Sequence, residues 1–358
     1  MKETFLSKSS SDSINLLKCL LCIGVVFIHT SFRPGESTLL FGTNWEEGVD
    51  YLRIKLFLQI FVHLFLMQIC VPLFFMVSGF LFFLKAPEDL FCLKWFLNKW
   101  KSRIKSLLIP YLIANSIFIV FIEGFNFFIG GGTFDLLKIF SGFWEYDNGL
   151  PADPPLWFVR DLIMAVLLSP LFFIIIKKSS WLLPVLIGVL WMVDFSEDSF
   201  VLWKPKAYFF FSLGAWLAIK QIDWVALFRK GPWLILYFIL YISILSLYLL
   251  YENKVFLTIS VPLGFSLFIS LSKTITVSMT KVVEQKYVVI TFFIFLYHYY
   301  IAPFMWRPYC VFFGTSEVAL LFAYLFGALT TIVLFYYFYI LINKFLPKFT
   351  SLIIGGRA

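Results

Sequence analysis

The first apolar stretch of the chain carries two ionisable side chains that a membrane should reject. It runs from Ile14 to Phe32 and contains Lys18 and His29. A helix rises 1.5 Å per residue and about 20 apolar residues cross a bilayer, so this stretch can span one. The spacing of the two residues is close to three helical turns, which places both on one face roughly 16 Å apart. An ionisable residue inside a span is a functional-site candidate, because lipid does not solvate it.

Each of these two residues also has a purely structural interpretation. Lys18 could extend its ammonium group to the cytoplasmic membrane surface, as long basic side chains do near the ends of spans. His29 lies deeper in the span, where it is either a packed structural side chain or a general base for proton transfer. The rest of the chain has to decide between these interpretations.

The composition indicates an integral membrane protein. Hydrophobic residues make up 61% of the chain and charged residues only 14%, and the mean hydropathy is +0.90. Soluble domains carry about 25% charged residues, so a soluble enzyme is excluded. The apolar runs are continuous rather than alternating, which predicts transmembrane helices and not barrel strands. The five cysteines lie in or beside these runs and indicate no disulfide framework.

The apolar runs predict an all-α polytopic fold with about ten transmembrane helices. Residues 1–13 and 347–358 are expected to be cytoplasmic tails around a transmembrane domain of residues 14–346. An interfacial helix carrying His63 is expected before the second span, and a basic connection from Lys94 to Lys105 before the third. The predicted spans lie near residues 14–32, the later part of 52–84, 104–128, 156–176, 181–193, 207–219, 233–250, 255–271, 288–305 and 318–342.

Basic residues orient this helical bundle, with both termini in the cytoplasm. Most of the 29 Lys and Arg residues fall in loops that this topology places inside, and most of the 21 Asp and Glu residues in loops outside. That is the positive-inside bias, so the net charge of +8 indicates topology and implies no nucleic-acid partner. The dense basic run before the third span suits either a phosphate-rich cytoplasmic ligand or anionic lipid headgroups.

The topology brings several polar side chains to a similar depth. They are His29, Arg160 and Asp161, joined by Glu123 or His298. Arg160 and Asp161 are adjacent, so their side chains are expected to point in different directions and to need separate partners. A histidine with a carboxylate and a cation nearby suits general-base catalysis, whereas a structural ion-pair cluster uses the same groups. A proton-coupled transporter is a further alternative, although the chain contains no internal repeat.

Six stretches occur in a characteristic order along the chain. They are Lys18 and His29 with ten residues between them, VPLFFMVSGFLFF, KWKSRIKSLLIPYL, PLWFVRDL, FFSLGAWLA and FFIFLYH. Together they resemble the bacterial membrane acyltransferase-3 family over residues 14–342. The resemblance implies transfer of an acyl group, usually acetyl from acetyl-CoA, to a hydroxyl of an extracytoplasmic glycan such as lipopolysaccharide or exopolysaccharide. It also implies a multi-pass protein of the bacterial inner membrane.

The family's residues map onto this chain with two departures. His29 matches the essential histidine, whereas Lys18 replaces an arginine and keeps the charge without the guanidinium fork. Arg103 matches the first of two arginines placed three apart, and Ser106 takes the place of the second, with Lys105 beside it. The resemblance implies that Lys18, Arg103 and Lys105 bind the phosphates of acyl-CoA. Acyl-CoA is then a co-substrate, and neither a permanently bound cofactor nor a metal is expected.

In the expected reaction, His29 takes a proton from a sugar hydroxyl, or is itself acylated first. Asp161 or Glu123 is expected to orient His29, and Arg160 to stabilise the developing oxyanion. The candidates for acceptor binding are Trp144, Tyr146, Asp147, Trp157 and His298. Aromatic rings at a membrane interface also serve as anchors, so those rings have a second interpretation.

Overall fold

The computed structural model describes residues 5–30, 54–90, 92–128, 136–146, 149–193, 204–229, 231–278, 284–314 and 316–357. All regular elements in this part of the chain are helical, as the apolar runs predict. Among the described residues, six helices are long and apolar enough to cross a membrane, or up to eight if each of two bent pairs is one span. This is the architecture of a polytopic membrane protein. The number of ten spans and the cytoplasmic side of both termini stay predictions.

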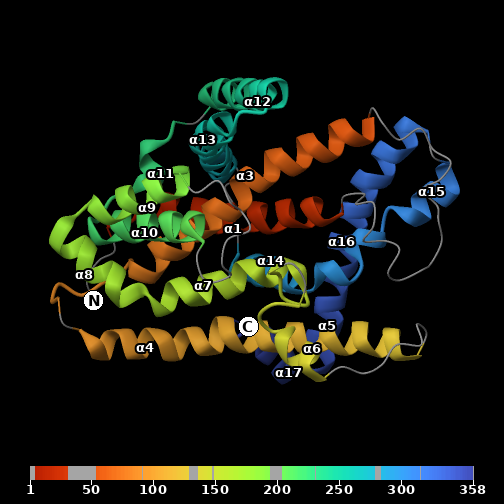
Figure 1. Ribbon diagram of the computed structural model, residues 1–358, viewed down its shortest axis with the longest axis horizontal. Coiled ribbons are helices and arrows are strands. Elements are labelled where there is room, and N and C mark those ends of the chain that lie inside the picture. Colours follow the sequence, from red (N-terminus) through yellow and green to blue (C-terminus); the bar gives the residue numbers. More distant parts are fainter. Residues whose placement is uncertain are drawn as a thin grey trace.

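Helices α1 (Lys8–His29) and α3 (Ile54–Phe83) pack together and run through the middle of the bundle (Figure 1). The interfacial helix and the second span that the sequence predicts are one continuous helix, α3. The side chain of His63 lies outside the described residues, as does Asp147.

Two glycines let α3 approach α10 (Pro205–Ile219) closely. A Cβ atom on Gly214 would lie 1.9 Å from the carbonyl oxygen of Met76, and one on Gly79 would lie 2.1 Å from that of Phe211. Only a residue without a side chain fits at these distances, as in other close helix contacts within membranes. These glycines belong to VPLFFMVSGFLFF and FFSLGAWLA, so both motifs encode this helix contact.

The basic run before the third span is helical, which corrects the connection that the sequence predicts. Helix α4 (Leu93–Arg103) passes through a π-helical turn (Ile104–Leu108) into α5 (Ile109–Phe128), and Figure 1 shows α4 and α5 following one another along one edge of the bundle. Apolar residues between the lysines explain the helix. Phe96 is buried, and the indole nitrogen of Trp100 donates a hydrogen bond of 2.9 Å to the carbonyl of Val166.

Two predicted straight spans are broken. A 3-10 turn (Pro154–Leu156) leads into α7 (Trp157–Leu167), which meets α8 (Ser169–Ser179) at 57°. Helix α14 (Gln285–Tyr297) ends at two 3-10 turns (His298–Tyr300 and Ala302–Phe304), and the chain then bends by 57° toward α15 (Arg307–Phe313). A proline opens the element that follows each bend, where its missing N–H does not interrupt a helical ladder.

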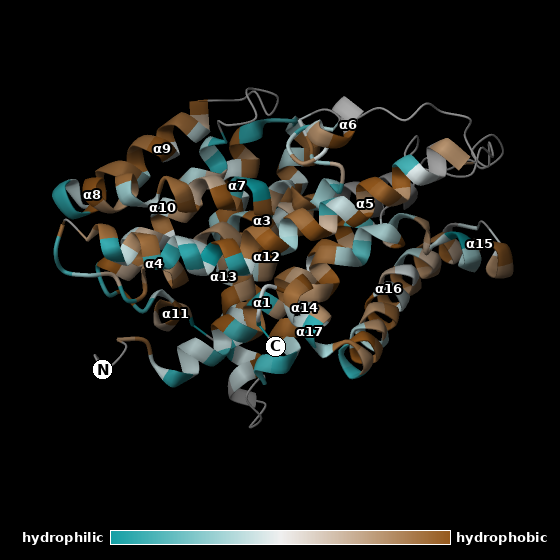
Figure 2. Cartoon of the chain, turned by 90° about the horizontal axis from the view of Figure 1, so that it is seen from below, coloured by the Kyte–Doolittle hydropathy of each residue, from teal (hydrophilic) through white to brown (hydrophobic). Residues whose placement is uncertain are grey.

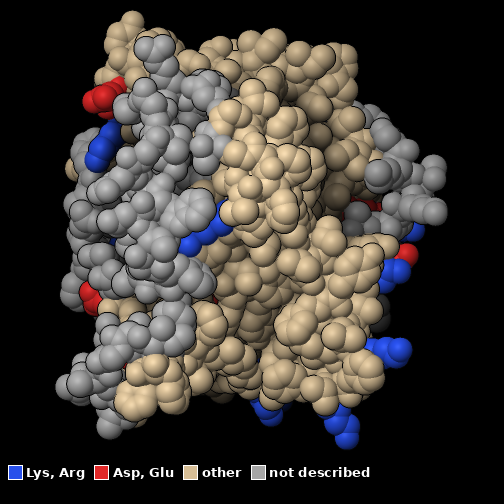
Figure 3. All heavy atoms as spheres, turned by 90° about the vertical axis from the view of Figure 1, so that its right-hand side faces the viewer, with Lys and Arg blue, Asp and Glu red and all other residues tan. Residues whose placement is uncertain are grey.

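The other described helices surround this centre. They are α6 (Leu136–Ser141), α9 (Leu182–Val193), α11 (Trp224–Leu227), α12 (Trp233–Tyr251), α13 (Lys254–Ser278), α16 (Glu317–Phe345) and α17 (Pro347–Ile353). Most of their length is hydrophobic in Figure 2. On the face in Figure 3, the uncharged surface is broad and the lysine and arginine atoms lie mainly near its margins, as a lipid-facing surface requires.

Candidate active site

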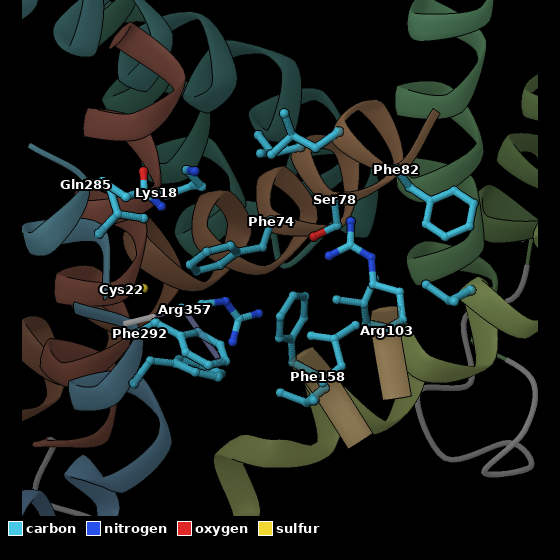
Figure 4. Close-up of a pocket in the computed structure, with 18 residues that line it drawn as sticks. Lys18, Cys22, Phe74, Ser78, Phe82, Arg103, Phe158, Gln285, Phe292 and Arg357 are labelled. Carbon is cyan, nitrogen blue, oxygen red and sulfur yellow. The ribbon is translucent and has the colours of Figure 1, made fainter. Parts of the chain in front are cut away.

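A cavity of about 200 Å³ lies between α1, α3, α7, α14 and the junction of α4 with the π-helical turn. Three cationic side chains line it, Lys18, Arg103 and Arg357. Ser78 and Gln285 add polar atoms, and most of the remaining lining is apolar or aromatic. Figure 4 shows the guanidinium groups of Arg103 and Arg357 extending from their separate elements into the space between the helices.

The cavity carries an uncompensated positive charge. No acidic residue lines it among the residues that the structure describes, and none of the three cations forms an ion pair with a described residue. Arg103 lies over the ring of Phe82 at 5.8 Å, and Arg357 over that of Phe292 at 3.8 Å. Burial and the nearby Arg103 lower the pKa of Arg357 to about 10. Aromatic faces stabilise cations only in part, so this cavity is suited to an anionic group.

An aromatic wall connects the cationic cavity with two histidines. Phe74 and Phe158 line the cavity, and both of their rings pack against Phe295, at 6.1 and 6.0 Å between centroids. The ring of Phe295 lies 6.3 Å from that of His298, which lies 5.3 Å from that of His29. A continuous set of ring contacts therefore leads from the cations to the histidine pair.

The histidine pair joins the end of α1 to the turn after α14. His29 is the last residue of α1, and Tyr299 meets its ring edge-on at 5.2 Å. His298 is fully buried, and its Nδ1 lies 2.9 Å from the carbonyl oxygen of Phe295. Because a carbonyl can only accept, Nδ1 carries the proton and Nε2 is left as an acceptor. That Nε2 has no hydrogen-bond partner in the described part of the chain.

Arg160 and Asp161 bond to each other, which corrects the prediction that they point in different directions. The Nε of Arg160 donates to Oδ1 of Asp161 at 2.9 Å, and both side chains are buried. The Nη1 of Arg160 donates to the carbonyls of Trp144 and Gly149 at 2.6 and 2.8 Å, and its guanidinium lies 5.5 Å from the Trp144 ring. Arg160 therefore holds the segment before α7 against that helix.

Two further carboxylates lie in the same region. Glu123 accepts a hydrogen bond of 2.6 Å from the hydroxyl of Tyr146. Asp153 is completely buried, and neither of its carboxylate oxygens has a partner within the described ranges. Its backbone N–H donates to Oδ1 of Asn115 at 3.1 Å. Burial raises the pKa of Asp153 well above its usual value, so this carboxyl is suited to the neutral form.

The structure brings together some of the residues that the sequence predicts and separates others. Lys18 and Arg103 meet in one cavity, whereas Lys105 is exposed and absent from its lining. His29 meets His298, which the sequence predicted at a similar depth and also proposed for acceptor binding. The described hydrogen bonds of Asp161 and Glu123 go to Arg160 and to Tyr146, not to a histidine.

The remaining predicted acceptor residues lie near α7. Trp157 begins α7 and packs partly buried against the core, whereas the side chain of Trp144 is 37% exposed. Tyr146 packs with Tyr299 against the buried residues Phe118, Ile119 and Ala152. Because Tyr299 also contacts His29, this cluster connects the segment before α7 with the histidine pair.

Arg357 is the cavity residue that sequence reasoning missed. The sequence predicts a tail at residues 347–358. In the structure, Ile353 at the end of α17 and Ile354 directly after it are buried in the main core. The signal was the pair Gly355–Gly356, since adjacent glycines before an arginine permit a tight turn against another backbone. Cys22, Ser78 and Gln285 gave no comparable signal, because each is a single polar residue within an apolar run.

Comparison with known proteins identifies the family of the chain. Residues 11–350 match the acyltransferase-3 family, which is described as an acyltransferase domain. The chain belongs to this family. It is also 29% identical to the succinoglycan biosynthesis protein ExoH of Rhizobium meliloti (strain 1021) over 180 residues, which are 47% of this chain and 44% of that protein. The match thus spans less than half of that relative, and no solved structure matches the chain.

Membership of the acyltransferase-3 family confirms the resemblance drawn from the six motifs. The matched residues include the helices that carry Lys18, Arg103, His29 and His298. The histidine pair and the cavity residues Lys18 and Arg103 therefore lie within the acyltransferase domain of a membrane protein. Arg357 lies beyond the matched residues, so the family comparison gives it no role.

Proposed function

We propose that this acyltransferase moves an acetyl group from acetyl-CoA, bound from the cytoplasm, to a hydroxyl of a glycan outside the cytoplasmic membrane. The observation that carries the proposal is the continuous path from an uncompensated cationic cavity, along aromatic rings, to the histidine pair. Acyl-CoA has matching parts: anionic phosphates at one end, an apolar arm in the middle and a reactive thioester at the other end.

The donor binds with its phosphates against Lys18 and Arg103. Charge-assisted hydrogen bonds to phosphate are strong, and a buried site screens them less than water does. The arm of the donor follows the wall formed by Phe74, Phe158 and Phe295 toward His298. The cavity of about 200 Å³ holds only part of such a ligand, so these side chains move apart when the donor binds.

His29 acts as the general base in one transfer step. It takes the proton of the acceptor hydroxyl while that oxygen attacks the thioester carbonyl carbon. The tetrahedral intermediate then collapses, the carbon–sulfur bond breaks, and the departing sulfur receives the proton from His29. The products are free CoA and the acetyl ester of the glycan. His298 positions the ring of His29 through the contact at 5.3 Å.

The acceptor is held on the side of the segment that Arg160 anchors. Both Nη1 hydrogen bonds of Arg160 go to backbone carbonyls of that segment, so we assign Arg160 a positioning role there in place of oxyanion stabilisation. The half-exposed ring of Trp144 offers a stacking face for a sugar. The similarity to the Rhizobium succinoglycan biosynthesis protein supports a polysaccharide as the acceptor.

The test is transfer of label from acetyl-CoA in membranes that contain the protein. Labelled acetyl should appear on an envelope glycan with wild-type protein and should be lost with His29→Ala at equal abundance. His63→Ala is the control for removal of another imidazole. Uptake of a solute into sealed vesicles without any labelled product would instead indicate a transporter, and full transfer by His29→Ala would exclude the proposed base.

A further inference from the structure

The segment after α17, residues Gly355–Arg357, turns toward the cationic cavity, and Arg357 lines it. Gly355 and Gly356 have φ values of +74° and +70°, a backbone conformation that side chains rarely tolerate. A Cβ atom on Gly355 would lie 2.6 Å from the Cα of Ser106, and one on Gly356 would lie 2.8 Å from the Cε of Lys105. The two glycines therefore let this turn lie directly against the π-helical turn that follows Arg103.

Arg357 is held in a defined position by this turn. Its Nη1 donates a hydrogen bond of 2.8 Å to the carbonyl of Ile354, and its guanidinium lies 3.8 Å from the centre of the Phe292 ring. Ile353 and Ile354 anchor the segment in the core, with 3% and 0% of their surfaces exposed. The hydroxyl of Tyr297 donates to the carbonyl of Ile353 at 3.4 Å.

The position of Arg357 is electrostatically unfavourable without an anion. It shares a small cavity with Lys18 and Arg103, and no carboxylate of the described residues lines that cavity. Like charges in a poorly solvated space repel one another more strongly than they do in water. A chain that only needed a surface charge here could leave Arg357 in solvent. An anionic ligand removes the repulsion, and a planar guanidinium suits a phosphate in particular.

We propose that Arg357 is a donor-binding residue, and that the segment Gly355–Arg357 completes the phosphate-binding end of the acyl-CoA site. The inference rests on the proposed function for the identity of the donor. Lys18 and Arg103 supply two cations to the cavity, and the third comes from this distant segment. Arg103 and Arg357 hold the phosphates from opposite sides of the cavity, as their directions in Figure 4 suggest.

The test is CoA binding to purified full-length variants in detergent, measured by calorimetry. Arg357→Ala should weaken CoA binding at least about tenfold, the loss of one charge-assisted hydrogen bond, and Arg357→Lys should restore much of it. Lys348→Ala is the matched control, because it removes the same charge from an exposed site on α17, the helix that precedes this segment. Gly355→Ala should resemble Arg357→Ala, since its Cβ displaces the turn. Pantetheine, which lacks the phosphates, should bind all the variants equally.

Each other outcome has a definite meaning. Equal CoA affinity of Arg357→Ala and Lys348→Ala, with wild-type melting temperatures, would overturn the role of Arg357 while leaving the proposed function intact. Failure of the wild-type protein to bind CoA would overturn both. Phosphatidylglycerol that copurifies with the wild type, is lost from Arg357→Ala and is not displaced by CoA would assign the cavity to a lipid phosphate and overturn the donor role.

Discussion

The rings of His29 and His298 lie 5.3 Å apart between their centroids, although their positions in the sequence are far apart. The backbone holds one ring nitrogen of His298. The Nδ1 of His298 faces the carbonyls of Phe295 and Ile294, at 2.9 and 3.2 Å, which orients its ring. The backbone thus orients His298, which in turn contacts the ring of His29, the proposed base at the end of α1.

Replacing His298 by phenylalanine should separate positioning from packing. Phe keeps a ring against His29 and Phe295 but removes both nitrogens. We expect kcat to fall by about tenfold or more, within the range for a disturbed general base, with the KM for acetyl-CoA unchanged. Tyr299→Phe is the control, because it keeps the other ring that contacts His29. A wild-type kcat in His298→Phe would mean that the histidine only fills space.

Arg103 and Lys105 should behave differently, because only Arg103 lines the cavity. Arg103→Ala should raise the KM for acetyl-CoA about tenfold with little change in kcat, the signature of lost binding common to substrate and transition state. Lys105→Ala should change the KM less than about twofold, since an exposed charge is screened by solvent. Steady-state kinetics on both purified variants measures the difference, and a reversed order would contradict the cavity as donor site.

The close contact between α3 and α10 should be sensitive to one methyl group. A Cβ on Gly214 would lie 1.9 Å from the carbonyl oxygen of Met76, so Gly214→Ala should push the helices apart. Overpacking of this kind costs about 1–3 kcal/mol, which should appear as a lower melting temperature in detergent. Gly124→Ala is the matched control, because nothing lies within 4 Å of its added Cβ. Equal melting temperatures would mean that the two helices are not held at this distance.

Asp153 should make stability depend on pH. Burial raises the pKa of its carboxyl well above the usual value, so the folded state keeps a proton that the unfolded state releases above about pH 4. The unfolded state then binds fewer protons, and stability falls as the pH rises from there toward the raised pKa. Asp153→Asn should remove this decline. Its melting temperature should exceed that of the wild type at pH 7, with a difference that shrinks toward pH 4. Parallel curves of melting temperature against pH for the two proteins would contradict a raised pKa of Asp153.

The sequence identified the helices that carry the candidate site residues. It was less informative about the contacts between their side chains. His29 and Lys18 were identified because an ionisable residue in an apolar run is conspicuous. The ion pair of Arg160 with Asp161 was missed because adjacent helical residues point apart at Cβ, and the long arginine side chain turned back to its neighbour. The bends before α8 and after α14 depend on local breaks that hydropathy averages away.

Contacts between segments far apart in the chain were the main feature that could not be predicted from the sequence. Arg357 reaches the cavity only because α17 is docked against the core, and the pair Gly355–Gly356 indicates a turn without showing what that turn packs against. The basic residues of α4 resembled a connection because lysines are interspersed among the apolar residues that hold the helix. The glycines of α3 and α10 were visible as motifs, but their pairing required the helices to be placed in space.

Variants of Lys18 test which end of the donor this part of α1 contacts. It lines the cavity together with Arg103 and Arg357, so its ammonium group should contact the phosphates while His29, on the same helix, contacts the acyl end. Lys18→Arg should keep or improve CoA affinity, since the guanidinium fork suits phosphate. Lys18→Gln should weaken it by removing the charge, and Lys18→Glu should nearly abolish it by repulsion.

A lipid-facing role for Lys18 predicts a different order. A side chain that only reached toward headgroups would affect membrane insertion slightly and CoA affinity not at all. The three purified variants therefore separate the two roles through one quantity, the dissociation constant for CoA. Lys18→Glu also places an anion beside the two remaining cations, because its carboxylate would attract Arg357 and Arg103 to itself and occupy them. Affinity for CoA should then fall further in Lys18→Glu than in Lys18→Gln, and equal affinities in all three variants would remove Lys18 from the donor site.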